Sequence, residues 1–363
     1  MSWLGAEVPY TRATALFRHF TGSTLSRATV RRTTVATAKA VQHLLATQPP
    51  TPGAPPVAPL QLSVDGSMLA IIGEGWKEAR VASLGVVGPD PRTPDAVRTT
   101  ELSYTAALCD AETFQEVALP EVRHRGLDQA RDVVAVSDGA PWIQAFVDYH
   151  CPQAVRILDF AHAAAYLAAA AQASFGPGTE ATSEWFVRQR HELRHGDPDQ
   201  VLAALAALPP SDERETALRY LGERRPMLAY QAFTEAGWPL GSGSVESAHK
   251  HVLQARMKGP GMRWGLATAQ AMIALRVTLA NGRWEQTWPQ LGAHQRQGQR
   301  LRSAARRADR RPAPPGPIPV VATAGAQLPP PERPKLIQQG KPTADHPWRR
   351  PLIRWSPATA TKM

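Results

Sequence analysis

The chain has 363 residues, enough for a core of two or more layers, so we expect two or three structural units. Its 41 Lys and Arg against 31 Asp and Glu give a formal charge of +10, which suits a polyanionic partner, although basic ends also occur as solubilising segments. Cys109 and Cys151 show no CxxC spacing and no neighbouring Cys/His cluster, which argues against a disulfide framework and a structural zinc site.

Residues 1–48 are predicted to form short helices with a break at Gly22. They begin without the charged-then-apolar pattern of an export signal, so we expect a cytoplasmic protein. Residues 1–50 hold six Lys or Arg against one Asp or Glu. The later helix places three arginines on or near one face: Arg27, Arg31 and Arg32. This pattern predicts a helix-turn-helix-like unit that contacts DNA phosphates, and a small dimerising helical unit explains it equally well.

A proline-rich segment at 49–59 separates these helices from a region of strands. Six of its eleven residues are proline, which predicts a stiff, extended linker and a domain boundary. Beyond it, β-branched runs between Gly, Pro and Asp predict elements in the order βββαβαβα. This order indicates a mixed α/β sheet over 60–174. The apolar helical stretch at 160–175 is too short for a membrane span.

The second half of the chain is predicted to be mainly helical. Strand patterns disappear over 175–237, where amphipathic helices form an insertion. The mixed core resumes at 238–295, where a helix begins behind the glycine-rich turn GSGS. The tail at 296–363 is predicted to be disordered, because residues 301–363 contain 13 prolines and 12 Lys or Arg with little apolar periodicity.

Three acidic residues suit a site for divalent cations. Two-metal phosphoryl transfer needs carboxylates from separate elements, because two cations about 3.5–4 Å apart must polarise the attacking and leaving oxygens together. Asp65 lies in the first predicted strand, Asp138 lies where a buried strand ends, and Glu246 lies in the first turn of the helix after GSGS. The ends of adjacent strands approach one another in a mixed sheet, so these side chains can face one crevice.

Each acid also has a purely structural interpretation. Asp65-Gly66 is a strong hairpin-turn dipeptide. Asp138 is suited to cap the helix that follows it. Glu246 gains from the helix macrodipole and is spaced to pair with Lys250. Because any three of 31 acidic residues can be chosen after the fact, the triple alone is a weak indication.

The sequence surrounding these acids is more specific. The segments SVDGSM, VAVSDGAPWIQAFVDYHCPQAVRILDFAHAAAYL and GSGSVESAHKHVLQARMKGPGMRW occur in this order across 60–290. They resemble the bacterial insertion-sequence DDE transposases of the ISKra-type branch, which carry a helical insertion before the final Glu. The most specific parts are DGAxWI followed by LDFxHA, and GSGxVES followed by RMKGxGMxW. The resemblance implies an RNase H-like core, binding to element ends, and DNA strand cleavage and transfer with two Mg²⁺ (or Mn²⁺).

The resemblance places the catalytic, metal-binding triad on Asp65, Asp138 and Glu246. It also singles out Asp159 and His162, for which we expect a supporting or DNA-positioning role. A helix cap at Asp159 and a packed helical residue at His162 are equally good interpretations. The basic loop ARMKGPGMRWG adds candidates for clamping the DNA backbone or stacking on a base: Arg256, Lys258, Arg263 and Trp264. Trp264 is better explained as a core residue.

We therefore expect a DNA transposase that binds element ends and target DNA, forms a homo-oligomer on DNA and is nucleoid-associated when bound, without a membrane partner. The region before the core is short compared with that of full-length relatives, which indicates a truncated copy. Two alternatives stay open. One is a decayed relic that binds DNA without catalysis, and the other is an RNase H-like nuclease acting on RNA/DNA hybrids or junctions.

Overall fold

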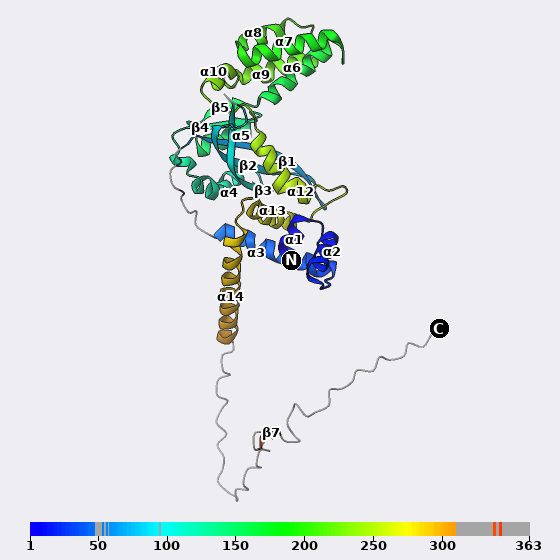
Figure 1. Cartoon of the computed structure of the whole chain (residues 1–363), viewed down its shortest axis with the longest axis vertical. Helices are drawn as coiled ribbons and strands as arrows, with labels where there is room; N and C mark the ends of the chain where they lie inside the picture. The colour runs from blue at the N-terminus through cyan, green and yellow to red at the C-terminus, as the bar shows by residue number, and fades with distance from the viewer. Residues whose placement is uncertain are drawn as a thin grey trace, which may run out of the picture. The chain divides into compact units, whose positions relative to one another are not determined.

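The structure, a computed structural model, describes residues 1–47, 53, 56, 58–93, 96–309, 337–338 and 341–342 (Figure 1). The chain divides into two compact units, residues 1–303 and 304–363. In the second unit, the described residues comprise the end of α14 (Trp284–Asp309) and an antiparallel pair formed by β6 (Ile337–Gln338) and β7 (Lys341–Pro342). Among the helices that the structure describes, none is long and apolar enough to cross a membrane.

A five-stranded mixed sheet forms the centre of the first unit, and its strand order is β3-β2-β1-β4-β5. Its strands are β1 (Leu60–Ile71), β2 (Gly75–Pro89), β3 (Val97–Ala107), β4 (Val133–Ser137) and β5 (Val155–Leu158). β2 runs antiparallel to its two neighbours, β1 and β3, whereas β4 and β5 run parallel to β1. The following helices lie between or after the strands: α4 (Ala111–His124), η1 (Leu127–Gln129), α5 (Pro141–His150) and α6 (Phe160–Phe175). The predicted mixed α/β class is confirmed.

The hairpin of β1 and β2 turns at residues 72–74, well beyond Asp65. Asp65 lies within the ladder, where it pairs with Val81. Gly73 and Gly75 have φ angles of 80° and 73°, which glycine adopts without the steric cost of a Cβ. The hairpin-turn interpretation of Asp65-Gly66 is therefore wrong.

The two faces of β1 differ in polarity. Its even-numbered residues from Leu60 to Val64 pack against α4 and α5 in one hydrophobic cluster. Gln61 and Ser63 are also buried but are polar. Because side chains alternate between the faces of a strand, Asp65 lies on the same face as Gln61 and Ser63. This polar face is the one on which the candidate site forms.

The N-terminal helices are α1 (Ser2–Glu7), α2 (Tyr10–Thr21) and α3 (Arg27–Thr47). Apolar residues of α1 and α3 share a hydrophobic cluster with α13 (Leu266–Ala280). The buried Arg276 of α13 also forms an ion pair with Glu7, at 2.6 Å between Nη1 and Oε2. The helical prediction for this segment is confirmed, and its helices pack as part of the first compact unit. Most of the predicted linker at 49–59 lies outside the described residues.

The predicted helical insertion consists of α7 (Glu180–His195), α8 (Pro198–Ala206), α9 (Asp212–Glu223), η2 (Arg225–Met227) and α10 (Tyr230–Glu235). Its first three helices begin where the side chains of Thr179, Asp197 and Ser211 accept hydrogen bonds from backbone N–H groups of the first turn. Their apolar residues pack with α6, β4 and β5 in one hydrophobic cluster. The insertion is thus joined to the parallel side of the sheet.

The chain then returns to the sheet through α11 (Gly243–Ala248), the π-helical segment η3 (His249–Gln254) and α12 (Ala255–Met257), which precede α13 and α14. The helix predicted after the GSGS turn is present. Residues 296–309 belong to α14, so the prediction of disorder is wrong there. The rest of the predicted tail, apart from β6 and β7, lies outside the described residues.

Candidate active site

Asp65 lies on β1, and Asp138 follows directly after the neighbouring parallel strand β4. The ladder between β1 and β4 pairs residues 60–62 with residues 133–135. The same offset, extended three residues beyond this pairing, relates Asp65 to Asp138, and the charge of Asp138 acts on Asp65. The sheet register therefore brings together two acids that are far apart in sequence.

The carboxylate of Asp65 lies between a backbone donor and an imidazole. Its Oδ1 accepts a hydrogen bond of 2.7 Å from the N–H of Gly66. Its Oδ2 lies 3.7 Å from Nε2 of His249. Burial raises the pKa of Asp65, the negative charge of Asp138 raises it further, and the Gly66 bond, His249 and His162 oppose this rise. Asp138, His162 and His249 are thus all close enough to act electrostatically on Asp65.

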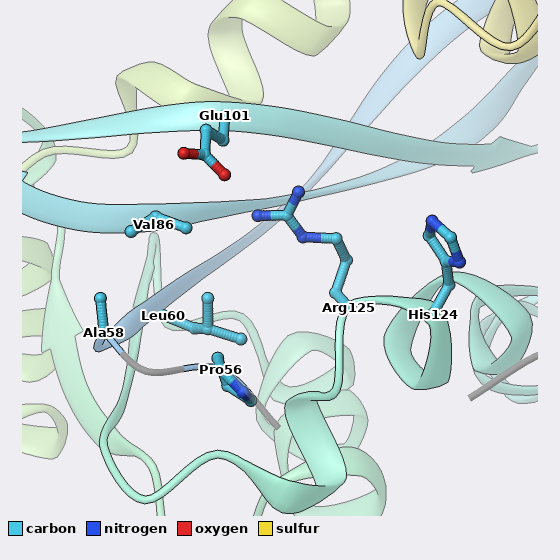
Figure 2. A pocket seen from close by; sticks show the side chains of 7 residues that line it. All are labelled: Pro56, Ala58, Leu60, Val86, Glu101, His124 and Arg125. Carbon is cyan, nitrogen blue, oxygen red and sulfur yellow. The ribbon is translucent and has the colours of Figure 1, made fainter. Parts of the chain in front are cut away.

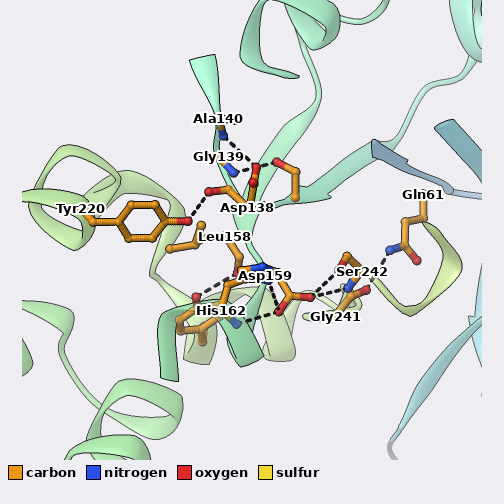
Figure 3. A network of polar contacts seen from close by, with 12 residues as sticks. Gln61, Asp138, Gly139, Ala140, Leu158, Asp159, His162, Tyr220, Gly241 and Ser242 are labelled. Carbon is orange, nitrogen blue, oxygen red and sulfur yellow. Dashed lines mark hydrogen bonds and ion pairs between the residues drawn. The ribbon is translucent and has the colours of Figure 1, made fainter. Parts of the chain in front are cut away.

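The turn that carries Asp138 is fixed by its own backbone and by the insertion (Figure 3). Oδ1 of Asp138 accepts a hydrogen bond of 2.9 Å from the N–H of Ala140, immediately before α5. The hydroxyl of Tyr220 donates to the backbone carbonyl of Asp138. Nε of Arg224 donates to the carbonyl of Gly139 at 3.2 Å. The side chain of Asp138 therefore stabilises the turn before α5. The capping interpretation is only partly correct, because the N–H that Asp138 bonds belongs to Ala140, which precedes the helix.

Tyr220 and Arg224 both come from α9 and its C-terminal end, one helical turn apart. The guanidinium of Arg224 lies 4.0 Å from the ring centroid of Tyr220. The ring of Tyr166, from α6, is stacked on the ring of Tyr220 at 4.0 Å between the centroids. Gly139 has a φ of 73°, and a Cβ there would lie 2.6 Å from Nε of Arg224. We call Tyr220 and Arg224 the α9 clamp, because they hold the turn between β4 and α5.

Asp159 connects the start of α6 to the turn before Glu246 (Figure 3). Its Oδ1 accepts the N–H of His162 at 2.9 Å, and its Oδ2 accepts both the N–H and the hydroxyl of Ser242 at 2.7 Å. Burial alone would raise the pKa of Asp159, but the hydrogen bonds from His162 and Ser242 outweigh it and keep the pKa well below its usual value. Asp159 is thus a helix cap and also a support for the third acid.

His162 is more exposed than a packed helical residue. Its side chain is 55% exposed, and its Nδ1 lies 3.4 Å from Oδ1 of Asp159. The hydrogen bond with Asp159 raises the pKa of His162, and the charges of Asp138 and Asp65 act in the same direction. The packed-residue interpretation is therefore wrong, because the ring lies at the surface in the field of three carboxylates.

Side chains from two strands hold the turn at residues 241–244. Nε2 of Gln61 donates to the carbonyl of Gly241 at 3.0 Å. The hydroxyl of Ser83 donates to that of Ser244 at 2.9 Å. Together with the Asp159 bonds to Ser242, these contacts fix where α11 begins over the polar face of β1. Glu246 lies in the first turn of that helix.

Glu246 is exposed, whereas His249, three residues later, is buried. Glu246 raises the pKa of His249, so the two side chains interact electrostatically, although burial is the largest influence and leaves that pKa below its usual value. Within the part of the chain that the structure describes, Glu246 makes no ion pair with Lys250 like those found elsewhere, so the helical-pair interpretation gains no support.

The donors around Asp65 suit a hard divalent cation, although they do not form a closed ligand set. Among the described residues, no group of three or more His, Cys, Asp or Glu side chains lies close enough to hold a metal ion as they stand. Two observations nevertheless fit a cation here. The charge of Asp138 disfavours an ionised Asp65, and Nε2 of His249 is buried without a hydrogen-bond partner. A cation beside Asp65 would favour its ionised form and would give Nε2 of His249 a partner.

The basic loop after η3 divides into exposed and buried members. Nζ of Lys258 donates to the hydroxyl of Ser67 on β1 at 2.7 Å, and Arg263 is exposed. Arg256 is 3% exposed, and its guanidinium donates to the carbonyl of Gly5 at 3.0 Å. It also lies over the ring of the buried Trp264, at 5.0 Å from the centroid. The interpretation of Trp264 as a core residue is confirmed, and the expected DNA contact of Arg256 is wrong for this structure, because its side chain is also buried.

Other predicted contacts lie away from these acids. Arg27, Arg31 and Arg32 are all exposed in the first turns of α3, where the DNA-binding prediction required them to be. A cavity of about 370 Å³ lies near the start of β1 (Figure 2). It is lined by Pro56, Ala58, Leu60, Val86, Glu101, His124 and Arg125. None of the candidate residues lines this cavity.

Comparison with models of protein families gives no match for this chain, and comparison with curated proteins gives none either. The resemblance to the ISKra-type transposases therefore stays a prediction.

Four residues that shape the site were not predicted from sequence: Tyr220, Arg224, Ser242 and His249. His249 had a detectable signal, because spacing of three from Glu246 puts both residues on one face of a helix. Ser242 belongs to the GSGS turn, but nothing in that turn indicates that Asp159 is its partner. The α9 clamp had no local signal, since an amphipathic helix with Tyr and Arg residues is common at protein surfaces.

Proposed function

We propose that this protein is a DDE transposase that cleaves and joins DNA strands at the acidic site formed by Asp65, Asp138 and Glu246. The observation that supports the proposal is the proximity of Asp65 on β1 to Asp138, which follows the neighbouring parallel strand β4 and acts electrostatically on Asp65. His249 lies 3.7 Å from Asp65, and the charge of Glu246 also acts on His249. These relations support a shared site for the three acids.

The topology supports an RNase H-like identity for the core. Three antiparallel strands followed by two strands parallel to β1 give the strand order β3-β2-β1-β4-β5. This arrangement agrees with what the resemblance to ISKra-type transposases implies. The helical insertion between α6 and the turn before Glu246 also agrees with it.

Asp65, Asp138 and Glu246 are the residues that would hold two Mg²⁺ or Mn²⁺ ions. Such ions supply activation of water or a 3′-hydroxyl and stabilise the charge that develops on a phosphodiester. The role of the protein is to fix where the carboxylates stand. The α9 clamp positions the turn of Asp138, and Asp159 positions the helix of Glu246 through Ser242.

Exposed basic residues provide contacts for DNA. Lys258 lies beside β1 two residues along from Asp65, through its bond to Ser67, and is placed to meet a phosphate near the acids. Arg263 is exposed on the same loop. The arginines at the start of α3 are a second basic surface for phosphates of an element end. Joining two ends in one reaction requires more than one catalytic chain on DNA, so we propose a homo-oligomer there.

The decisive experiment measures Mg²⁺- or Mn²⁺-dependent nicking and joining of a DNA duplex that carries the ends flanking the coding region. Wild type is compared with Asp138→Asn, with Asp128→Asn as a matched control at an exposed aspartate in η1. We expect the first substitution to lower the rate by about three orders of magnitude or more, because stabilisation of transition-state charge is lost. The control retains the wild-type rate.

Three results separate this function from its alternatives. Equal absence of nicking in wild type and Asp138→Asn, with DNA binding retained, indicates a relic that only binds DNA. Cleavage of RNA/DNA hybrids in preference to element ends indicates a nuclease. Nicking of the ends that disappears in Asp138→Asn, followed by joining to a second duplex, supports the transposase.

A further inference from the structure

His249 presents an unsatisfied nitrogen to the acidic site. The residue is 9% exposed, and its Nε2 is buried without a hydrogen-bond partner among the described residues. This nitrogen lies 3.7 Å from Oδ2 of Asp65, a distance that is too long for a hydrogen bond. A buried polar atom usually has a partner, so an orphan that faces a carboxylate needs an explanation.

The backbone places His249 and Glu246 together. They stand three residues apart, and their side chains interact electrostatically. His249 is also the first residue of the π-helical segment η3, which follows α11 directly. Single turns of π-helix are rare in proteins and are frequent at functional sites, where they change the direction of a side chain relative to a regular α-helix. This deviation begins at the residue that faces Asp65.

We propose that His249 is a further ligand of the divalent cation at this site, beside Asp65. This inference rests on the proposed function. A carboxylate and an imidazole that face each other at 3.7 Å leave their lone pairs available to a shared cation, whereas a direct hydrogen bond would consume them. The inference therefore explains both the orphaned nitrogen and its direction.

A nitrogen ligand predicts a preference among cations. Carboxylate oxygens suit Mg²⁺ and Mn²⁺ alike, but an imidazole nitrogen binds softer transition metals better than Mg²⁺. A site with Asp65 and His249 is thus expected to bind Mn²⁺ more tightly than Mg²⁺. Replacing His249 by Gln is expected to weaken the binding of Mn²⁺ more than the binding of Mg²⁺.

The test measures Mn²⁺ binding to the full chain without DNA. Electron paramagnetic resonance gives the free Mn²⁺ concentration during a titration, and electron spin echo detects magnetic coupling of bound Mn²⁺ to a ligand nitrogen. We expect His249→Gln to weaken Mn²⁺ binding about 10-fold or more and to remove the nitrogen coupling. Two matched controls are His251→Gln, an exposed residue of the same segment, and His162→Gln, the other imidazole near Asp65.

The outcomes distinguish this inference from the proposed function. Coupling that persists in both controls and disappears in His249→Gln supports the ligand. Unchanged Mn²⁺ affinity in His249→Gln, or no nitrogen coupling in wild type, overturns it while leaving the proposed function intact. The proposed function fails as well if wild type binds no Mn²⁺, or if Asp65→Asn does not abolish the Mn²⁺ binding of wild type.

A folding defect in His249→Gln leaves the inference testable. Circular dichroism and thermal unfolding identify such a defect before any titration. The comparison of wild type with His162→Gln then tests the inference. Both chains retain His249, but only wild type retains the second imidazole near Asp65. Nitrogen coupling retained in His162→Gln supports His249 as the ligand, and coupling lost there overturns it.

Discussion

The segments that carry Asp138 and Glu246 are held in place by different kinds of contact. The turn of Asp138 is held by backbone carbonyls that accept bonds from the α9 clamp, so the insertion acts directly on the second acid. Glu246 is an exposed side chain in the six-residue α11, and its position depends on a turn anchored to Asp159. The position of the second acid therefore depends on tertiary packing of a helix, and that of the third depends on one buried carboxylate.

The largest effect on stability is expected from Asp159→Ala. This change removes three hydrogen-bond acceptor contacts of a buried, ionised carboxylate and leaves the donors of Ser242 without their partner. We expect a loss of about 3 kcal/mol in the free energy of unfolding, measured by urea titration at pH 7. Strand cleavage is expected to fall as well, because the start of α11 loses its anchor.

This effect has a defined pH dependence. The folded pKa of Asp159 is lower than its unfolded value, so the ionised form contributes stability above the unfolded pKa of about 3.9. That contribution is lost as the pH falls below this value. The difference between wild type and Asp159→Ala should therefore shrink from pH 7 to pH 3.

The matched control is a helix cap that has no bonds like those of Asp159 to Ser242. Asp110 caps α4 by accepting the N–H and hydroxyl of Thr113 at an exposed position. Asp110→Ala should cost less stability than Asp159→Ala and leave strand cleavage unchanged. Equal losses in the two variants would mean that Asp159 acts as an ordinary cap.

A smaller effect is expected from Gly139→Ala on the Asp138 side. The new Cβ would lie 2.6 Å from Nε of Arg224, and the residue would keep a φ of 73°. Strain of this kind costs about 1–3 kcal/mol. We expect thermal unfolding at a lower temperature and a reduced rate of strand cleavage, because relief of the clash moves the α9 clamp.

Gly237→Ala separates backbone strain from the clash. Gly237 has a φ of 76°, and a Cβ there would meet nothing within 4 Å. Its substitution is expected to cost about 1 kcal/mol from the left-handed backbone alone, with no change in cleavage rate. If both glycine variants lose activity equally, the clamp does not position Asp138.

The local elements of this fold could be predicted from sequence, because their signals are local. Alternation of apolar and polar residues predicts β1, and Thr179, Asp197 and Ser211 mark the starts of helices in the insertion. The hairpin-turn interpretation of Asp65 failed because Asp-Gly favours a turn only in isolation, and here it lies within a twelve-residue strand that pairs with β2 along its whole length.

The contacts that complete the candidate site depend on packing between distant segments. Arg256 resembled a DNA-binding residue because its neighbours in sequence are basic and glycine-rich. Its burial follows from α1, whose Gly5 carbonyl accepts its guanidinium N–H across 251 positions of sequence. Tyr220 reaches the carbonyl of Asp138 across 82 positions. Periodicity along one helix shows which face is apolar, but not which carbonyl of another segment its polar residues meet.

The smallest expected effect comes from Tyr220→Phe, which tests the clamp without a steric clash. The change removes one hydrogen bond to the carbonyl of Asp138 and preserves the ring stacked on Tyr166. We expect a loss of about 1 kcal/mol in the free energy of unfolding, measured by urea titration. Cleavage should slow a few-fold, because Arg224 still holds the neighbouring carbonyl of Gly139.

Tyr166→Phe is the control for this variant, since it keeps the same stack and leaves the hydroxyl of Tyr220 in place. A slower rate in Tyr220→Phe than in Tyr166→Phe, at equal stability, means that the insertion acts on catalysis through the Asp138 carbonyl. Equal rates mean that Arg224 alone fixes the turn. In that case Arg224→Lys, which keeps the charge but loses the Nε donor, should produce the larger fall in rate.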